Sequence, residues 1–165
     1  MRDTINWDEY FMGIAVMASQ RSKDNRSQVG AVIVKNNRVL STGYNGMSNN
    51  VDDKEMPWGA WSVGADNFME NKHFYICHAE LNAIINAKTD LTGTTLYTTL
   101  YPCNECAKLI IQSGIKEVVY LSEKFNKEYA QFKASEYVLN KAKIKTRKFK
   151  SNLKKIELSF EEKDV

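Results

Sequence analysis

A histidine–acid pair followed, a short span later, by two cysteines constrains this chain more than any other feature. His78-Ala79-Glu80 comes first, and Pro102-Cys103-Asn104-Glu105-Cys106 follows. One imidazole and two thiolates are ligands that Zn²⁺ prefers, and three protein ligands leave the fourth tetrahedral position free for water. The pattern therefore predicts an open, catalytic zinc site with His78, Cys103 and Cys106 as ligands and with Glu80 beside the metal.

The residues around these ligands favour two helices that begin at the metal. Cys103 and Cys106 share one face of a helix, and Pro102 suits the start of that helix. The positive end of its dipole lowers the thiol pKa and so favours thiolate ligation. His78 and Glu80 open a second helix. From its end, Glu80 can take a proton from a water on the metal and return it to a leaving group, which is general acid–base catalysis worth roughly 10²–10⁴-fold in rate.

Each half of this pattern has a simpler interpretation when it stands alone. A lone Cys-x-x-Cys is as often a structural zinc site or a redox pair as it is a catalytic site. A lone His-x-Glu carries little information. Both together, in this order and each followed by a helix-forming stretch, favour catalysis.

Length and composition indicate one soluble, cytoplasmic domain over residues 1–165. The sequence contains no run of about 18 apolar residues, so we expect no membrane span. Asp3, Asp8 and Glu9 lie where a signal peptide would be apolar, so we expect no signal peptide. Three cysteines are an odd number, and two belong to the motif, so we expect no disulfide framework. Cys77 is interpreted as a buried free thiol. The net charge of +3 gives no reason to expect a nucleic-acid partner.

Helical and alternating periodicities predict an α/β fold with an opening β-hairpin. The predicted helices span residues 7–20, 79–85, 103–113 and 127–141. The predicted strands span residues 29–34, 38–44, 94–101, 116–121 and 144–149. Asn6 and Glu9 have the spacing of a capping box, and Gly114 suits a helix end. The strands and helices that alternate after the hairpin predict a central, largely parallel sheet between helices.

In the first helix, apolar residues follow helical spacing at Trp7, Phe11, Ile14 and Ala18, and the aromatic residues are interpreted as core. The last helix is predicted to bury Phe132, Tyr137 and Val138 or Leu139. Asn36-Asn37 is predicted to turn the chain between the hairpin strands, and Gly43-Tyr44-Asn45-Gly46 is predicted to be a strand end that runs into a turn.

Two segments differ from this alternation. Residues 47–73 form an irregular insert with Trp58 and Trp61, and because tryptophan is costly to leave exposed, we expect an ordered flap over the site or a subunit contact. Residues 141–155 carry eight Lys or Arg and no acid. They predict either a solvated edge strand that charge keeps from aggregating or a patch for phosphate or nucleic acid.

From about Tyr10 to Phe160 the chain resembles the deoxycytidylate (dCMP) deaminases of the cytidine deaminase superfamily, whose zinc signature is H-x-E…P-C-x-x-C. The matching stretches are residues 21–24, 28–34, 43–46, 78–84 and 101–108. The resemblance implies a three-layer α/β/α sandwich with a central mixed five-stranded sheet. It also implies hydrolysis of dCMP to dUMP and ammonia, which supplies dUMP for thymidylate synthesis. Water held on Zn²⁺ would attack C4 of the ring while Glu80 shuttles protons.

The resemblance further implies contacts for the rest of the nucleotide. The side chain of Asn45 would bond the sugar, and the backbone N–H of Ala79 the pyrimidine carbonyl. Val29 and Tyr101 would pack on the ring. Without the resemblance, Asn45-Gly46 is simply turn chemistry.

The 5′-phosphate needs cationic or N–H donors. Arg26 is the candidate, with Ser22 and Lys23 near it. The alternative is that Arg26 is a solvated loop charge.

Members of this family are commonly hexamers that dCTP activates and dTTP inhibits. The resemblance therefore implies a homo-oligomer with a second nucleotide site near Gly43, Tyr44 and Gly46, where Mg²⁺ would accompany the effector. Two features depart from the family pattern. Ser48 stands where relatives usually carry proline, and residues 57–61 lack basic residues that some relatives carry nearby.

Two other functions compete with a small-molecule deaminase. A nucleic-acid deaminase would need a basic surface leading to the pocket, and residues 141–155 are its sole support. A non-catalytic, zinc-stabilised nucleotide-binding module would have no use for the carboxylate of Glu80. We therefore expect dCMP as substrate, and neither nucleic acid nor membrane as partner.

Overall fold

The structure is a computed structural model that describes residues 4–59, 68–123 and 129–161. Its helices are α1 (Trp7–Ser19), α2 (Ala79–Ala87), α3 (Asn104–Gln112) and α4 (Ala130–Lys141), with two short 3-10 helices, η1 (Phe68–Glu70) and η2 (Lys72–Phe74). Its strands are β1 (Gly30–Lys35), β2 (Arg38–Tyr44), β3 (Gly46–Met47), β4 (Ile76–Cys77), β5 (Thr95–Leu100), β6 (Glu117–Ser122) and β7 (Lys145–Lys148).

Five of the strands form one mixed sheet in the order β2-β1-β5-β6-β7. β1 pairs antiparallel with both β2 and β5, whereas β5, β6 and β7 run parallel to one another. β3 and β4 form a separate two-stranded ribbon. The sheet order confirms the opening hairpin and the parallel arrangement after it.

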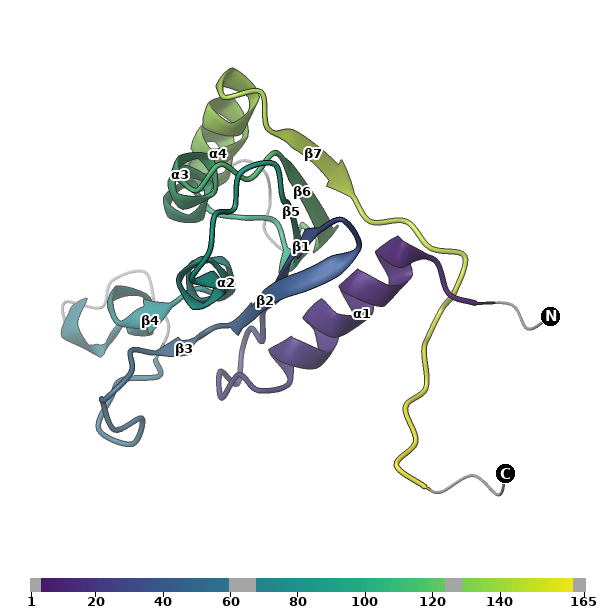
Figure 1. Cartoon of the computed structure of the whole chain (residues 1–165). Helices are drawn as coiled ribbons and strands as arrows, with labels where there is room; N and C mark the ends of the chain where they lie inside the picture. The colour runs from purple at the N-terminus through teal and green to yellow at the C-terminus, as the bar shows by residue number, and fades with distance from the viewer. Residues whose placement is uncertain (1–3, 60–67, 124–128, 162–165) are drawn as a thin grey trace.

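Helices cover both faces of this sheet, which confirms the three-layer architecture (Figure 1). α1 packs on one face, and α2, α3 and α4 lie on the other. Alternate residues of β1 divide between the two cores because successive side chains of a strand point to opposite faces. Val32 and Val34 join the core under α1, and Ala31 and Ile33 join the core under α2.

α1 begins at the predicted capping box. Asn6 Oδ1 accepts a hydrogen bond from the N–H of Glu9 at 2.9 Å, and Glu9 Oε2 accepts one from the N–H of Asn6 at 2.9 Å. The interpretation of its aromatic residues as core is correct for Phe11 and wrong for Trp7, which is 55% exposed. Tyr10 is exposed too, because the helix covers the sheet with a narrower stripe of residues. That stripe consists of Phe11, Met12, Ala15 and Ser19.

The core predicted for α4 also needs one correction. Phe132 and Leu139 are buried, whereas Tyr137 is 66% exposed. Leu139 faces α3 and the sheet, and Tyr137, two residues earlier, points away from them. The predicted start of this helix at Lys127 lies outside the described residues.

The predicted turn at Asn45-Gly46 is wrong. The chain continues from β2 through Asn45 into β3, and it turns later, at Asn49-Asn50. Asn45 leaves the strand pattern because its backbone N–H donates to the carbonyl of Val29 at 3.2 Å and its side chain accepts from the N–H of Val29 at 2.8 Å. By contrast, Asn36 and Asn37 form the predicted hairpin turn with left-handed backbone angles.

The described part of residues 47–73 consists of β3 at its start, turns, an isolated bridge between Gly59 and Asn71, and the two 3-10 helices. Trp58 is half-buried, and its indole N–H donates to the carbonyl of Asp53 at 2.8 Å. Trp61 lies outside the described residues. Lys72, at the end of the segment, is almost completely buried.

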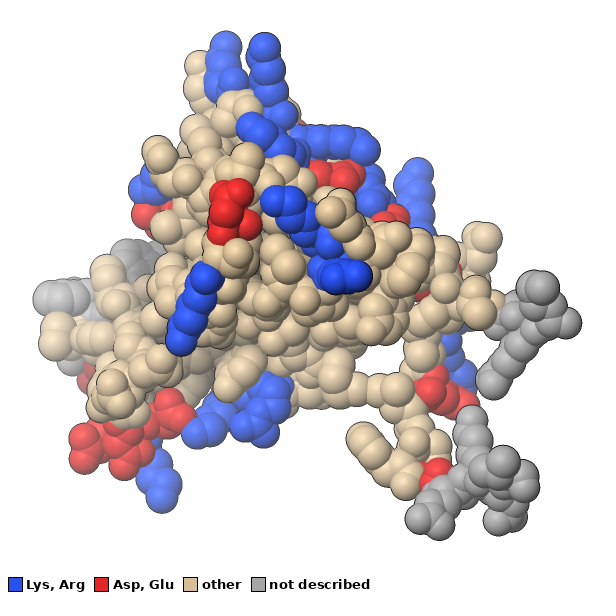
Figure 2. All heavy atoms as spheres, in the orientation of Figure 1, with Lys and Arg blue, Asp and Glu red and all other residues tan. Residues whose placement is uncertain are grey.

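β7 is an edge strand of the sheet, as the first interpretation of the basic segment predicts. Figure 2 shows Lys and Arg side chains gathered where α4 and β7 lie in Figure 1. Part of this charge is paired, since Lys145 contacts Glu117, and Arg147 contacts both Asp8 and Glu117. None of the helices in the described residues has the length and apolar character needed to cross a membrane.

Candidate active site

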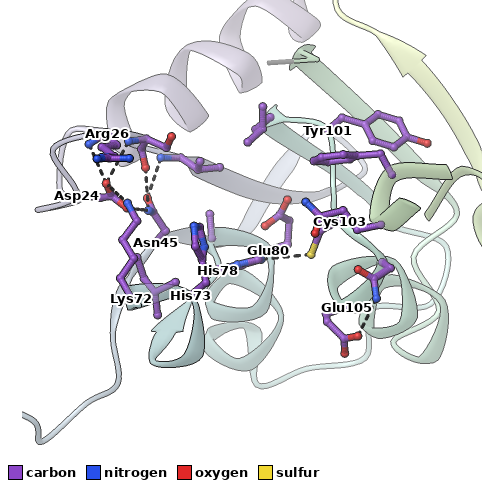
Figure 3. Close-up of a pocket in the computed structure, with 18 of the residues that line it drawn as sticks. Asp24, Arg26, Asn45, Lys72, His73, His78, Glu80, Tyr101, Cys103 and Glu105 are labelled. Atoms are coloured by element: carbon purple, nitrogen blue, oxygen red, sulfur yellow. Dashed lines mark hydrogen bonds and ion pairs between the residues drawn. The ribbon is translucent and has the colours of Figure 1, made fainter. Parts of the chain in front are cut away.

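A pocket of about 590 Å³ opens where β5 ends and where α2 and α3 begin. Its walls come from five parts of the chain: the loop before β1, Asn45 between β2 and β3, the segment from η2 into α2, the turn after β5 into α3, and the start of α4. Figure 3 shows Cys103 and Glu80 toward one end of the pocket and Asp24, Arg26 and Lys72 toward the other. His73 and His78 lie between these two groups.

The two helices at the pocket begin at the predicted metal ligands. His78 is the N-cap residue of α2, and Cys103 is the N-cap residue of α3. Cys106 follows one turn into α3 and is buried. His78 Nδ1 lies 3.3 Å from Cys106 Sγ and 3.4 Å from Cys103 Sγ, and the three donor atoms lie within 4.8 Å of one another. Ligand atoms around a tetrahedral Zn²⁺ at about 2.0–2.3 Å have comparable separations.

The charges of this cluster also suit a divalent cation. The neighbouring Cys106 thiol and the His78 imidazole lower the pKa of Cys103 to about 4. The Cys103 sulfur and the nearby Glu80 raise the pKa of His78 to about 9. Cys106, close to the Cys103 thiolate and buried, has its pKa raised. A bound metal ion would relieve this crowding of negative charge and favour both thiolates, because thiolates are the form that binds metal.

Glu80 lies next to the three donor atoms and is 4% exposed. Its Oε2 accepts from the Cys106 thiol at 3.4 Å, and its Oε1 accepts from the hydroxyl of Thr98, a fully buried residue of β5, at 3.4 Å. Burial raises the pKa of Glu80 above its ordinary value, although the nearby His78 opposes the rise. A carboxyl group whose pKa is raised takes up a proton more readily than an ordinary one, which suits it to general acid–base catalysis.

Several residues predicted to contact substrate line the same pocket. They are Arg26, Val29, Asn45, Ala79 and Tyr101. Ala79 is the first residue of α2, so its N–H is one of the helical donors that lack an acceptor within the helix. Asn45 is buried, and its amide group donates to the carbonyl of Ser27 at 2.8 Å.

Ser22 and Lys23 are not among the residues that line this pocket. Ser22 is buried beneath the loop, where its hydroxyl accepts from the N–H of Asp24 at 3.2 Å. Lys23 points away, with 70% of its side chain exposed, and pairs with Asp53. Arg26 is therefore the residue of this trio that reaches the pocket.

The predicted effector residues lie outside the pocket lining as well. Gly43 packs against the first turn of α2 so closely that a Cβ atom there would lie 2.2 Å from the carbonyl oxygen of Ala79. Tyr44 is 38% exposed, and Gly46 is in β3. Cys77, interpreted as a buried thiol, is only half-buried, with its Sγ 3.5 Å from Ser48 Oγ.

Three pocket residues were not predicted: Asp24, Lys72 and His73. Asp24 and Lys72 form a buried ion pair. Burial and the neighbouring Lys72 lower the pKa of His73. Asp24 lies in one of the stretches that match the family, so a signal existed for it. Lys72 and His73 follow an irregular segment, and nothing in the local pattern distinguishes them from solvated surface residues.

The sequence matches the family model of the cytidine and deoxycytidylate deaminase zinc-binding region over residues 5–122. It is 46% identical over 161 residues to human deoxycytidylate deaminase, and this alignment covers 96% of this chain and 88% of the human protein. It is 45% identical over 123 residues to deoxycytidylate deaminase of mycobacterium phage D29, covering 72% of this chain and 96% of the phage protein. The solved structure of dCMP deaminase from cyanophage S-TIM5 in complex with dCMP and dUMP is 27% identical, with a TM-score of 0.68 over 90% of this chain and 100% of that one.

Proposed function

Because the chain belongs to the cytidine and deoxycytidylate deaminase family, we propose that it hydrolyses dCMP with one water to dUMP and ammonia. The observation that carries this proposal is the cluster of His78, Cys103 and Cys106 around the buried carboxyl group of Glu80, in a pocket of nucleotide size. The names of the human and phage relatives support dCMP as the substrate.

In this proposal His78, Cys103 and Cys106 hold Zn²⁺. When bound, zinc supplies a Lewis acid that brings the pKa of a coordinated water to about 7 and so provides a nucleophile at neutral pH. The positive N-terminal ends of α2 and α3 face the same position, which favours the two thiolates there.

Glu80 moves the protons of the reaction. Its carboxylate takes the first proton from the attacking water and gives it to N3 of the ring. It then takes the proton of the new hydroxyl group at C4 and gives it to the amino group. Cleavage of the bond between C4 and this nitrogen releases ammonia and leaves the C4 carbonyl and the N3–H of dUMP. The buried position of Glu80 raises its pKa, which favours its acceptance of a proton from the water.

The rest of the pocket orients the nucleotide. The free N–H of Ala79 donates to the pyrimidine carbonyl, and Val29 and Tyr101 pack on the ring. Asn45 bonds the sugar through its amide group. Arg26, at the far end of the pocket from Glu80, binds the 5′-phosphate (Figure 3).

A homo-hexamer, activation by dCTP, inhibition by dTTP and an effector-associated Mg²⁺ stay predictions of the family resemblance. The effector contacts at Gly43, Tyr44 and Gly46 also stay predictions. The close packing of Gly43 on α2 already requires glycine at that position, whether or not an effector binds.

A single assay tests the substrate. We expect ammonia release from dCMP, far slower release from deoxycytidine, and none from dCTP or single-stranded DNA. Turnover of dCMP should vary little with salt, because a mononucleotide releases few counterions. Preferential turnover of single-stranded DNA with a steep loss at high salt would instead establish a nucleic-acid deaminase.

Arg26→Ala tests the phosphate contact. Loss of a charge-assisted hydrogen bond should reduce kcat/KM for dCMP by about 10- to 100-fold. The value for deoxycytidine, which has no phosphate, should stay within about twofold of wild type. An equal loss on both substrates in steady-state assays would reject the assignment.

A further inference from the structure

The pocket wall contains a buried ion pair that the proposed chemistry does not use. Lys72 Nζ lies 2.6 Å from Asp24 Oδ1 and 2.5 Å from Asp24 Oδ2. The side chain of Lys72 is 3% exposed and that of Asp24 is 2% exposed. Removing two charges from water is costly, and a buried ion pair is often no more stabilising than apolar residues of the same size. Stability alone is therefore a weak account of this pair.

Asp24 organises the first wall of the pocket. Its Oδ1 accepts hydrogen bonds from the backbone N–H of Arg26 at 2.8 Å and from that of Ser27 at 3.1 Å. Its Oδ2 lies 3.4 Å from the amide nitrogen of Asn45, whose Oδ1 accepts from the N–H of Val29 at 2.8 Å. One carboxylate thus fixes the backbone that carries Arg26 and, through Asn45, the backbone of Val29.

Lys72 belongs to a second wall of the pocket, the segment from η2 into α2. It begins η2, and its backbone N–H donates to the carbonyl of Gly59 at 2.9 Å, next to the bridge between Gly59 and Asn71. The residue after it, His73, lines the pocket. Asp24 and Lys72 are 48 positions apart in the sequence, so their contact joins two walls that the chain does not otherwise connect closely.

We propose that Asp24 and Lys72 are a positioning pair that sets the separation of the two pocket walls and holds Arg26 where the phosphate of the nucleotide lies. This inference rests on the proposed function for its substrate, and on the ion pair and its hydrogen bonds for its geometry. Neither residue touches the reacting atoms in this proposal.

Three variants test the pair. Lys72→Met keeps the length of the side chain and removes its charge. Asp24→Asn keeps an oxygen that can accept from Arg26 and Ser27. The double variant removes both charges and leaves no buried ion unpaired, so it should fold even if Lys72→Met does not. Lys145→Met is the matched control, because Lys145 forms an exposed ion pair with Glu117 at the opposite end of the sheet.

The first measurement is hydrogen exchange, which needs no turnover. In Lys72→Met the backbone amides of Arg26 and Ser27 should exchange at least about tenfold faster than in wild type, because the unpaired carboxylate of Asp24 leaves its buried position. Amides of the central strand β5 and the zinc content should not change. Unaltered exchange at Arg26 and Ser27 would overturn the proposal.

The second measurement separates positioning from stability. The double variant should recover most of the thermal stability of the protein, yet its kcat/KM for dCMP should stay about 10- to 100-fold below wild type, mainly through KM. Deoxycytidine should be affected less. If kcat/KM returns together with Tm, the pair only stabilises the fold and the proposal is wrong.

The two proposals can fail separately. If the wild-type protein does not deaminate dCMP but Lys72→Met still exposes the amides of Arg26 and Ser27, the substrate assignment fails and the positioning role stands. If wild type deaminates dCMP and both measurements on the variants match the Lys145→Met control, the positioning role fails and the function stands.

Discussion

At the scale of single residues, burial distinguishes the two glutamates that line the pocket, Glu80 and Glu105. Glu105, also in the pocket lining, is exposed and forms an ion pair with Lys108, whereas Glu80 is enclosed between a cysteine thiol and the hydroxyl of Thr98. The same functional group therefore has two environments in one pocket, and burial raises the pKa of Glu80 above its ordinary value.

Glu80→Gln should reduce kcat for dCMP by about 10²–10⁴-fold or more, because glutamine keeps the shape of the side chain and cannot transfer the proton. Zinc content by elemental analysis and Tm should match wild type. Near-normal turnover in this variant would remove Glu80 from the proton transfer.

Cys103→Ala should lose the metal and much of its stabilising effect, since a site missing one of three ligands binds zinc far more weakly. We expect a zinc stoichiometry near zero and a lower Tm. Cys77→Ala is the matched control, because Cys77 contacts Ser48 outside the pocket. This variant should retain full zinc. Full zinc in both variants would show that the ligand set is different.

Residue-level prediction from the sequence is strongest where chemistry restricts residue type and spacing. The spacing of His78, Cys103 and Cys106 predicts that their side chains lie together, and the structure brings their donor atoms within 4.8 Å of one another. Their role as zinc ligands stays a prediction. Lys72 gave no such signal. A lysine in an irregular segment is normally solvated, and its burial depends on an aspartate 48 positions away.

At the scale of elements, the site depends on how closely α2 approaches β2. Gly43 allows the approach, since a Cβ atom at this position would lie 2.2 Å from the Ala79 carbonyl oxygen and 2.3 Å from the Ala83 nitrogen. α2 carries Glu80 and begins at His78, so any displacement of its first turn moves both.

Gly43→Ala should therefore lower the free energy of unfolding by about 1–3 kcal/mol, the usual cost of overpacking, and should also lower kcat. Gly46→Ala is the control, since nothing lies within 4 Å of a Cβ atom there. Denaturant unfolding of both variants checks the prediction. Equal stabilities would mean that α2 can shift away from Gly43 without cost.

Local sequence signals predicted where helices begin and end, but they did not predict which individual side chains are buried. The capping box at Asn6 and the left-handed glycine at Gly114 mark helix ends in the sequence and in the structure alike. Trp7 and Tyr137 were misassigned to the core because helical periodicity identifies a face but not its width. The turn expected at Asn45-Gly46 was wrong because Asn45 bonds to Val29, a distant residue in the loop just before β1.

At the scale of the whole molecule, one network joins the two ends of the described chain. Arg147 in β7 donates to both oxygens of Asp8 in α1 at 2.5 and 2.8 Å, and to Glu117 in β6 at 2.8 Å. Tyr97 of the central strand donates to Asp8 at 2.7 Å. The hydrogen bond from Arg147 lowers the pKa of Asp8 despite partial burial. Burial alone would raise the pKa of Glu117, but Arg147 and Lys145 outweigh it and lower the pKa.

These lowered pKa values predict acid sensitivity. A carboxyl group whose pKa is lower in the folded state stabilises the fold above its ordinary pKa, and that stabilisation is lost as the pH falls through the folded value. Between about pH 5 and about pH 3, wild type should therefore lose more stability than Arg147→Met.

Urea unfolding of wild type and Arg147→Met across this pH range measures the difference in stability lost. Any release of metal at low pH affects both proteins alike and so cancels in the comparison. Lys155→Met, which breaks an exposed ion pair with Glu157, should follow the wild-type profile. Parallel profiles for wild type and Arg147→Met would show that the network contributes nothing measurable.

The linear order of the site has a consequence for how the protein is made. His78 and Glu80 leave the ribosome before β5, and the two thiols emerge only after that strand, which becomes the middle of the sheet. A nascent chain that stops short of Cys103 therefore carries His78 without either thiol of the proposed metal site. If the three residues hold zinc as proposed, the complete ligand set exists only after the central strand has been translated, so metal binding is tied to completion of the sheet.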